Sequence, residues 1–178
     1  MLCERSKSLL RVLVCCCALA TAMHAEQFGN LIFTAPPGWT RVPQPDGLAF
    51  LAPKNNPQNT VRLFLLQDQE LNGDFRAAFK SIVQSRVKQS ERVLQRSEPH
   101  PFPSGTNAES LFEIFVVQDA GREAIRAYVG LHSSNRINVI TLTAPNQETF
   151  QHNLPVLKDF LSHLQFNGPK QDPSGPSR

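Results

Sequence analysis

The segment EAIRAYVGLH, residues 123–132, contains three side chains that can bind a ligand, and they are separated by two and by four residues. Arg126, Tyr128 and His132 share one face if this segment is a strand, because successive strand side chains point to opposite faces. A guanidinium, a phenol and an imidazole would then form a polar patch on the exposed side of a sheet. The alternative is a solvated strand end without a role. An enzyme would need an acid to join these side chains in a concave pocket.

Carboxylates form a second candidate group. Asp68 and Glu70 lie two residues apart at the end of a predicted strand, with Asp74 nearby. A hard cation binds carboxylate oxygens, but the segment lacks the Asp, Asn and Gly density of a calcium loop, which favours ordinary surface charge. The sequence also has no H-E-x-x-H motif, no G-x-S-x-G motif and no Gly-rich phosphate loop. We therefore predict no catalytic residue, no metal site and no cofactor, and a protein that is not an enzyme.

The N-terminal segment has the layout of a secretory signal peptide. Three basic residues precede an uncharged apolar run, and small residues suited to signal peptidase follow, with cleavage predicted after Ala22 or Ala25. The run is shorter than the roughly 20 apolar residues of a membrane anchor. A lipoprotein signal is the lesser alternative, since no small residue precedes the cysteines of the run. We expect residues 1–25 to be a signal peptide and the protein to be exported, periplasmic or secreted.

Removal of the signal peptide limits the chemistry of the mature chain. All four cysteines lie within residues 1–25, so the mature protein would have no disulfide and no thiolate nucleophile. Its charge would be nearly balanced, with 15 basic and 14 acidic residues. A balanced charge gives no reason to expect nucleic-acid binding. No transmembrane segment is expected after cleavage, and the oligomeric state stays open.

Hydrophobic periodicity divides the mature chain into strands and two helices. Apolar residues at helical spacing after Asp74, a predicted N-cap, indicate a helix over 74–89. A second helix is expected after Asn146, with a kink or a break at Pro155. Segments with strand character are 28–34, 39–42, 48–52, 60–66, 93–94, 108–118, 123–132 and 137–143. Helices that cover a mainly antiparallel sheet make a single α+β domain, predicted here over 26–167, followed by a disordered tail at 168–178.

The stretch FTAPPGW, residues 33–39, contains the only tryptophan of the chain. Proline cannot donate to a strand ladder, so Pro36 and Pro37 predict a turn between two strands, with Trp39 packed into or beside the core. The alternative is a Trp39 that stacks on a ligand from an exposed loop. We therefore include Trp39 with Arg126, Tyr128 and His132 in the candidate binding surface.

The same stretch resembles the opening of PsbP-like and Mog-type domains, which include secreted bacterial proteins of the DcrB type. The helix after the first strands, the three-strand meander and the C-terminal helix ending at Leu164-Gln165-Phe166 follow the order of that family. The resemblance covers about residues 28–166 and implies an α-β-α sandwich with a central antiparallel sheet. It also implies a protein that binds other proteins without catalysis, as accessory subunits of photosystem II do.

We thus expect a non-catalytic exported domain that binds another envelope protein. Its interaction surface would be the open sheet face and the loops at 53–59 and 98–107, since loops tend to carry function. A minor hydrolase with a site on the sheet face is one alternative. A small-molecule carrier is the other, and it would need an apolar cavity beneath the first helix.

Overall fold

The computed structural model of the 178-residue chain describes residues 25–53 and 61–167. The predicted signal peptide (except Ala25), the loop expected at 53–59 (except Pro53) and the predicted tail lie outside the described residues. The elements are β1 (Ala25–Phe28), β2 (Leu31–Thr34), β3 (Thr40–Gln44), β4 (Gly47–Leu51), β5 (Arg62–Leu66), β6 (Gln69–Glu70), α2 (Phe75–Ser85), β7 (Arg92–Arg96), β8 (His100–Pro101), β9 (Glu109–Asp119), β10 (Arg122–Ser133), β11 (Arg136–Ala144), α3 (Gln147–Ser162) and β12 (Gln165–Phe166).

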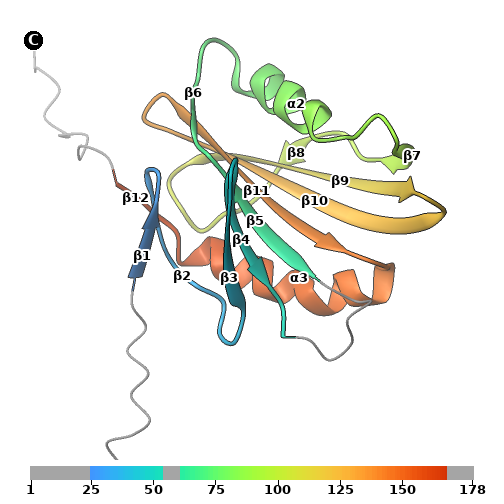
Figure 1. Ribbon diagram of the computed structural model, residues 1–178. Coiled ribbons are helices and arrows are strands. Elements are labelled where there is room, and N and C mark those ends of the chain that lie inside the picture. Colours follow the sequence, from blue (N-terminus) through green and yellow to red (C-terminus); the bar gives the residue numbers. More distant parts are fainter. Residues whose placement is uncertain (1–24, 54–60, 168–178) are drawn as a thin grey trace, which may run out of the picture.

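An antiparallel sheet forms the centre of the molecule. Its main path runs β3-β4-β5-β11-β10-β9-β7, with β6 paired to β11 and β8 paired to β9. Helix α3 lies along one side of this sheet and α2 lies on the other (Figure 1). The structure therefore confirms the predicted α+β sandwich with a central, mainly antiparallel sheet. In this strand order β5 is a neighbour of β11 although the two strands come from distant parts of the chain, whereas β11, β10 and β9 follow one another in the sequence.

Local sequence explains where the two helices begin. The side chain of Asp74 accepts a hydrogen bond from the Ala77 N–H at 2.8 Å, and Asn146 accepts one from Thr149 N–H at 2.8 Å. Both are N-caps, as predicted. Helix α2 ends at Ser85, before the predicted residue 89. Helix α3 continues through Pro155 to Ser162, so the helix does not break at that proline.

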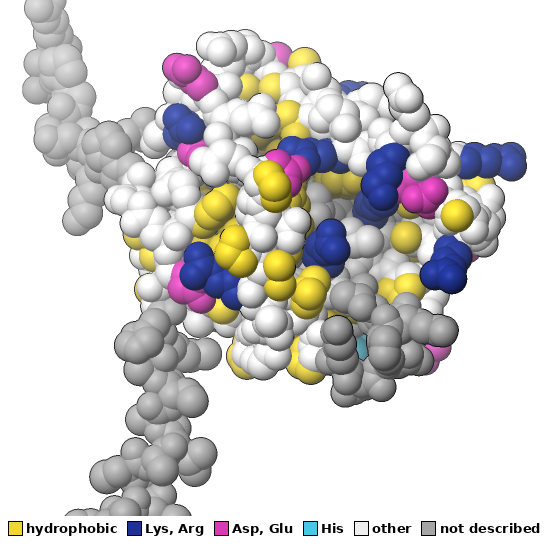
Figure 2. Space-filling model, viewed as in Figure 1, with side chains coloured by type: hydrophobic (Ala, Val, Ile, Leu, Met, Phe, Trp, Pro, Cys, Tyr) yellow, Lys and Arg dark blue, Asp and Glu magenta, His cyan; other side chains and the backbone are white. Residues whose placement is uncertain are grey.

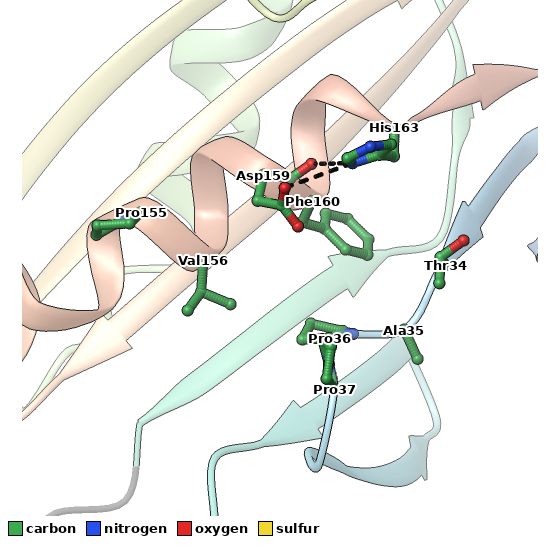
Figure 3. Close-up of a pocket in the computed structure, with 9 residues that line it drawn as sticks. All are labelled: Thr34, Ala35, Pro36, Pro37, Pro155, Val156, Asp159, Phe160 and His163. Atoms are coloured by element: carbon green, nitrogen blue, oxygen red, sulfur yellow. Dashed lines mark hydrogen bonds and ion pairs between the residues drawn. The ribbon is translucent and has the colours of Figure 1, made fainter. Parts of the chain in front are cut away.

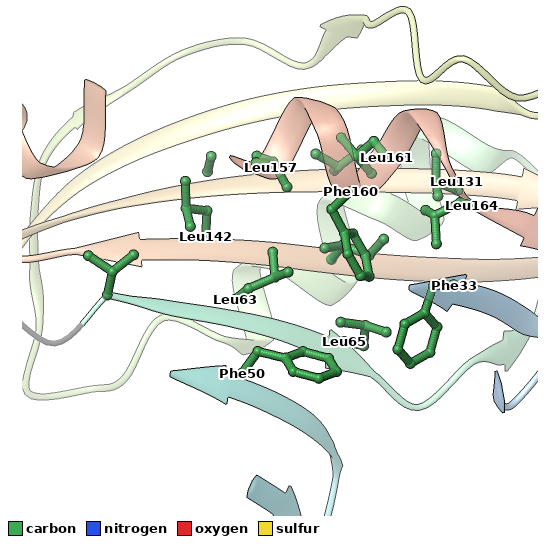
Figure 4. Close-up of a cluster of buried hydrophobic side chains, with 14 of the residues drawn as sticks. Phe33, Phe50, Leu63, Leu65, Leu131, Leu142, Leu157, Phe160, Leu161 and Leu164 are labelled. Atoms are coloured by element: carbon green, nitrogen blue, oxygen red, sulfur yellow. The ribbon is translucent and has the colours of Figure 1, made fainter. Parts of the chain in front are cut away.

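The core has two parts, one on each side of the sheet. Between the sheet and α3, the rings of Phe33, Phe50 and Phe160 lie 5.5 to 6.4 Å apart, surrounded by buried leucines (Figure 4). On the other side, Phe79 of α2 packs on the sheet with Tyr128 and other apolar side chains. Burial of this apolar surface on both faces is the main stabilising contribution to the sandwich.

A small second sheet closes one end of the molecule (Figure 1). The segment expected as one strand at 28–34 is instead a hairpin of β1 and β2, because the chain turns at Gly29-Asn30. Strand β12, which follows α3, pairs with β2 through Gln165 and Ile32. This pairing joins the two ends of the domain, and no local pattern in the sequence indicates it.

The proline-containing stretch at 33–39 forms a turn, as predicted. The Trp39 N–H donates to the Pro36 carbonyl at 3.1 Å, and Gly38 has a φ of +76°. Proline followed by a residue with positive φ is the pattern of a type II turn, which glycine satisfies without strain. Trp39 is half-buried and packs against the core beneath α3. The structure thus agrees with the prediction that Trp39 lies beside the core.

The segment expected as an exposed loop at 98–107 packs against the sheet edge. Phe102 stacks on Phe112 with ring centroids 5.1 Å apart, and Ser104 is buried. The Arg76 side chain donates to the Pro99 carbonyl at 2.6 Å. Most residues of this segment are exposed, as expected, but Pro99 and Ser104 are buried, and β8 pairs with β9 at the sheet edge.

Candidate functional site

Helix α2 leaves part of its face of the sheet uncovered, and a cleft of about 470 Å³ lies there. Its floor comes from β5, β10 and β11, and its wall comes from the segment that follows α2. Lys and Arg side chains gather around a hollow on the face that Figure 2 shows. Four basic residues and one acid line the cleft, namely Arg62, Arg86, Lys88, Arg126 and Asp46. The cleft is therefore suited to a ligand with negative charge.

Strand register places two of these bases in one row. Thr143 of β11 lies opposite Arg62 of β5 and also opposite Arg126 of β10. Residues directly opposite one another in antiparallel strands point to the same face. With strands about 4.8 Å apart, the Cα atoms of Arg62 and Arg126 lie roughly 10 Å apart, with Thr143 between them. We call this set the Arg-Thr-Arg row.

The neighbouring row is more apolar. Thr141 lies opposite Phe64 on one side and opposite Tyr128 on the other. Phe64 is half-buried and Tyr128 is 2% exposed, and all three side chains line the cleft together with Leu66. The cleft floor thus changes from cationic to largely apolar within two residues along each strand. A ligand that matches it carries an anionic group attached to an apolar one.

A buried carboxylate orients Arg126. The Glu91 side chain is fully buried, and its two oxygens accept hydrogen bonds from the two Nη atoms of Arg126, one of them at 2.9 Å. Glu91 also accepts the Lys88 N–H at 3.0 Å. Burial raises the pKa of Glu91, but the hydrogen bonds from Arg126 and Lys88 outweigh it and leave the pKa below its usual value. The charged pair is therefore the stable state, and it holds the guanidinium in one orientation.

Tyr128 is the other predicted site residue that reaches the cleft. It packs edge-on against Phe115, with ring centroids 5.5 Å apart. Burial raises the pKa of the Tyr128 hydroxyl, while the nearby Arg126 opposes that rise only in part. The phenol thus stays protonated and can donate a hydrogen bond to a ligand. The expectation that Tyr128 lies on an exposed face was wrong, because its ring packs with side chains of α2 next to the cleft and is 2% exposed.

The other two predicted site residues lie elsewhere. His132 stands under the start of α2, where its ring is 5.4 Å from that of Phe75 and its Nδ1 is 3.5 Å from a Glu109 oxygen. Trp39 packs against the core beneath α3. Of the four residues predicted as one surface, the structure brings only Arg126 and Tyr128 together.

Sequence reasoning missed Arg62, Thr141, Thr143 and Glu91. Alternation within TVRLFLL and INVITLT already places the first three on single strand faces. The order of strands that makes those faces adjacent is a tertiary property. Glu91 lies in a segment without periodicity, so no signal in the sequence indicates that it pairs with Arg126.

The carboxylates around the cleft are engaged in ion pairs. Asp46 pairs with Arg86, and Glu91 pairs with Arg126. Neither acid is thus set up as a general base beside a nucleophile, and the cleft lining provides hydrogen-bond donors. Arg62 is exposed and forms no ion pair with any residue among the described ranges. Among the donors of the Arg-Thr-Arg row, the Arg62 guanidinium therefore has the most N–H groups available to an anionic ligand.

Asp68 and Asp74, the carboxylates considered above as a lesser possibility for cation binding, have separate partners. Asp68 pairs with Arg136, while Asp74 caps α2. Among residues 25–53 and 61–167, no group of three or more His, Cys, Asp and Glu side chains is close enough to hold a metal ion. Each of these two acids thus has a structural partner of its own.

A second cavity lies between α3 and the turn at residues 34–37 (Figure 3). Its volume is about 360 Å³, and Ala35, Pro36, Pro37, Pro155 and Val156 give it a mainly apolar lining. Asp159 and His163 stand at one side, with 3.6 Å between Oδ1 of Asp159 and Nδ1 of His163. The small-molecule carrier alternative requires an apolar cavity beneath the first helix, whereas this cavity lies beside the second helix, α3.

The described part of the chain contains no helix with the length and hydropathy needed to cross a membrane. No family model matches the chain. A search of curated proteins found no match in sequence. Solved structures do resemble the chain.

Two of them have TM-scores above 0.5. The cyanobacterial PsbP (CyanoP) from Synechocystis aligns with a TM-score of 0.51 and 8% identity, over 80% of this chain and 90% of that one. LpqN of Mycobacterium tuberculosis, described as involved in cell envelope biogenesis, aligns with a TM-score of 0.54 and 11% identity, over 78% and 83%. The Ran-binding protein Mog1p of Saccharomyces cerevisiae aligns at 0.45 with 8% identity, over 82% and 97%. The first two alignments show that the chain has a PsbP-like fold, as the resemblance implied. Fold by itself does not assign a function.

Proposed function

We propose that this protein is an exported, non-catalytic binding module that holds another envelope protein through the cleft beside α2. The observation that carries the proposal is the composition of the cleft. Its donors come from β5, β10 and β11 and from the segment after α2, while the acids that would act as bases are paired with arginines. Such a site binds a partner and lacks the free base that hydrolysis requires.

Two further observations support the proposal. The N-terminal segment has the pattern of a signal peptide, which favours export. A protein of the same fold, LpqN, is described as involved in cell envelope biogenesis. A binding role in the envelope is consistent with both.

Affinity capture from the native host tests the proposal. The full chain, tagged at its C-terminus, would be expressed in its own host and recovered from the envelope and medium fractions. We expect one stoichiometric partner that copurifies with the wild type and is lost with Arg62→Gln. The matched control is Lys158→Gln, since Lys158 is exposed on α3 and lies outside the cleft. Mass measurement of the recovered protein would also identify the cleavage site. No copurifying partner, or a protein found only in the cytoplasm, would contradict the proposal.

A second candidate function is the transport of a small apolar molecule, which the cavity beside α3 favours. Its 360 Å³ and mainly apolar lining resemble a small ligand pocket. Val156→Trp would fill it from one wall. If this cavity carries a ligand, native mass spectrometry of the protein from its host should show an added mass that Val156→Trp removes. Absence of an added mass on the wild type, or the same added mass on Val156→Trp, would exclude this role.

A further inference from the structure

We infer that the cleft recognises a carboxylate attached to an apolar group, presented by the partner polypeptide. This inference rests on the proposed function and names the chemistry that the partner must offer. The structure supplies two adjoining rows with different properties. The Arg-Thr-Arg row is cationic, and the row of Phe64, Thr141 and Tyr128 beside it is largely apolar.

The Arg-Thr-Arg row suits a single planar anion. Arg62 and Arg126 flank Thr143, so one oxyanion above this threonine receives donors from both sides and from the hydroxyl below. Guanidinium groups match the planar geometry of a carboxylate through paired N–H donors. Glu91 accepts hydrogen bonds from two N–H groups of Arg126, and the Tyr128 hydroxyl is also within hydrogen-bonding reach of this guanidinium, so the exposed Arg62 supplies most of the free N–H donors of the row.

The charge around the row also limits the ligand. Asp46 and Glu91 already pair with Arg86 and Arg126, so Arg62 and Lys88 supply the excess positive charge of the cleft. Lys88 is itself 3.8 Å from an Asp119 oxygen. This small excess fits one carboxylate better than a doubly charged phosphate.

The apolar row continues from that anion site toward α2. A half-buried Phe64 and a buried Tyr128 ring form its two sides, with Leu66 farther along β5. Tyr128, Leu66 and Thr141 are 2%, 2% and 7% exposed, so the half-buried Phe64 ring is the main apolar surface that an aromatic or aliphatic side chain of the partner would cover. A volume of about 470 Å³ accommodates such a group together with its carboxylate.

A pair of small probes tests the chemistry. N-acetyl-phenylalanine carries a carboxylate next to an aromatic ring, and its amide differs only by loss of that charge. We expect the acid to shift the backbone amide signals of Thr141, Thr143 and Tyr128 in two-dimensional NMR of the full chain, and the amide to shift them at least tenfold more weakly. Inorganic phosphate should bind more weakly than the acid.

Matched variants test the residues. Arg62→Gln should weaken binding of the acid about tenfold or more, because it removes hydrogen bonds to a charged group. Thr143→Val keeps the shape of the side chain and should weaken binding a few-fold. Lys158→Gln should leave it unchanged. Well-dispersed amide spectra of all three variants would show that they remain folded.

Several results would overturn the inference. Equal binding of acid and amide would show that the carboxylate is not recognised, and equal binding of phosphate would show that the apolar row plays no part. Unchanged affinity in Arg62→Gln would place the site elsewhere.

Competition separates this inference from the proposed function. An excess of N-acetyl-phenylalanine should release the captured partner. If the acid binds but the partner stays bound, the ligand of the cleft is a free organic acid, and the partner uses another surface. If a partner is captured but the acid does not bind, the proposed function stands and the inference fails.

Discussion

Glu91 binds Arg126 through both of its carboxylate oxygens, although the two residues lie 35 positions apart in the chain. The Glu91 side chain is fully buried and that of Arg126 is 17% exposed. The pair connects the segment after α2 to the middle of β10, and so joins the wall of the cleft to its floor. The geometry of the cleft therefore depends on this ion pair.

Glu91→Gln should destabilise the protein by about 2 kcal/mol or more, because it leaves a largely buried guanidinium without its counter-ion. Urea unfolding followed by the fluorescence of Trp39 measures this change, since the chain has one tryptophan. The matched control is Asp119→Asn, which removes the exposed partner of Lys88 and should cost about 0.5 kcal/mol or less. Equal effects of the two substitutions would contradict the role given to Glu91.

The same pair predicts how stability depends on pH. The folded-state pKa of Glu91 lies below its usual value of 4.5. The stabilisation is therefore complete above that usual value and is lost as the pH falls through the lowered pKa. The free energy of unfolding, measured from neutral to acidic pH, should decline less steeply in Glu91→Gln than in the wild type. Parallel curves for the two proteins would show that the pair does not titrate in this way.

Tyr128 should titrate above its ordinary pKa of 10, chiefly because it is buried. It is the single tyrosine of the chain, so the ultraviolet absorbance of tyrosinate reports on it alone. Arg126→Met should raise the midpoint of this titration further, because the nearby cation favours the ionised phenol.

The raised pKa of Tyr128 also affects the free energy of unfolding. The neutral phenol contributes stability below pH 10, and this contribution is lost as the pH rises through the raised pKa. Circular dichroism at each pH checks that the protein is folded, and a midpoint at or below 10 would refute the prediction.

Gly130→Ala should destabilise the protein by about 1–3 kcal/mol through overpacking. A Cβ atom at this position would lie 2.6 Å from Cδ2 of Phe79, the residue that packs α2 onto the sheet. Chemical denaturation gives the cost, and the same substitution in a Phe79→Leu background should cost less because the smaller side chain makes room. A cost that is unchanged in that background would show that the two residues are not coupled.

Local features of the sequence determined most elements of the fold, although the segment expected as one strand at 28–34 is a hairpin. Asp74 and Asn146 begin the helices as predicted, because an N-cap depends on residues within one turn. The turn at Pro36 to Trp39 follows from the fixed φ of proline and the freedom of glycine. The three-strand meander likewise follows from alternation and turn residues within one continuous segment.

Only the tertiary structure decided which faces are open and which residues meet there. Arg62 and Thr143 are far apart in the chain and become neighbours because β5 pairs with β11. Tyr128 is buried because α2 packs over it, and His132 is separated from the cleft for the same reason. Strand order and helix placement depend on the summed burial of apolar surface across the whole domain, which a periodic pattern in one segment cannot specify. The sequence by itself thus determined the elements, and long-range packing determined the site.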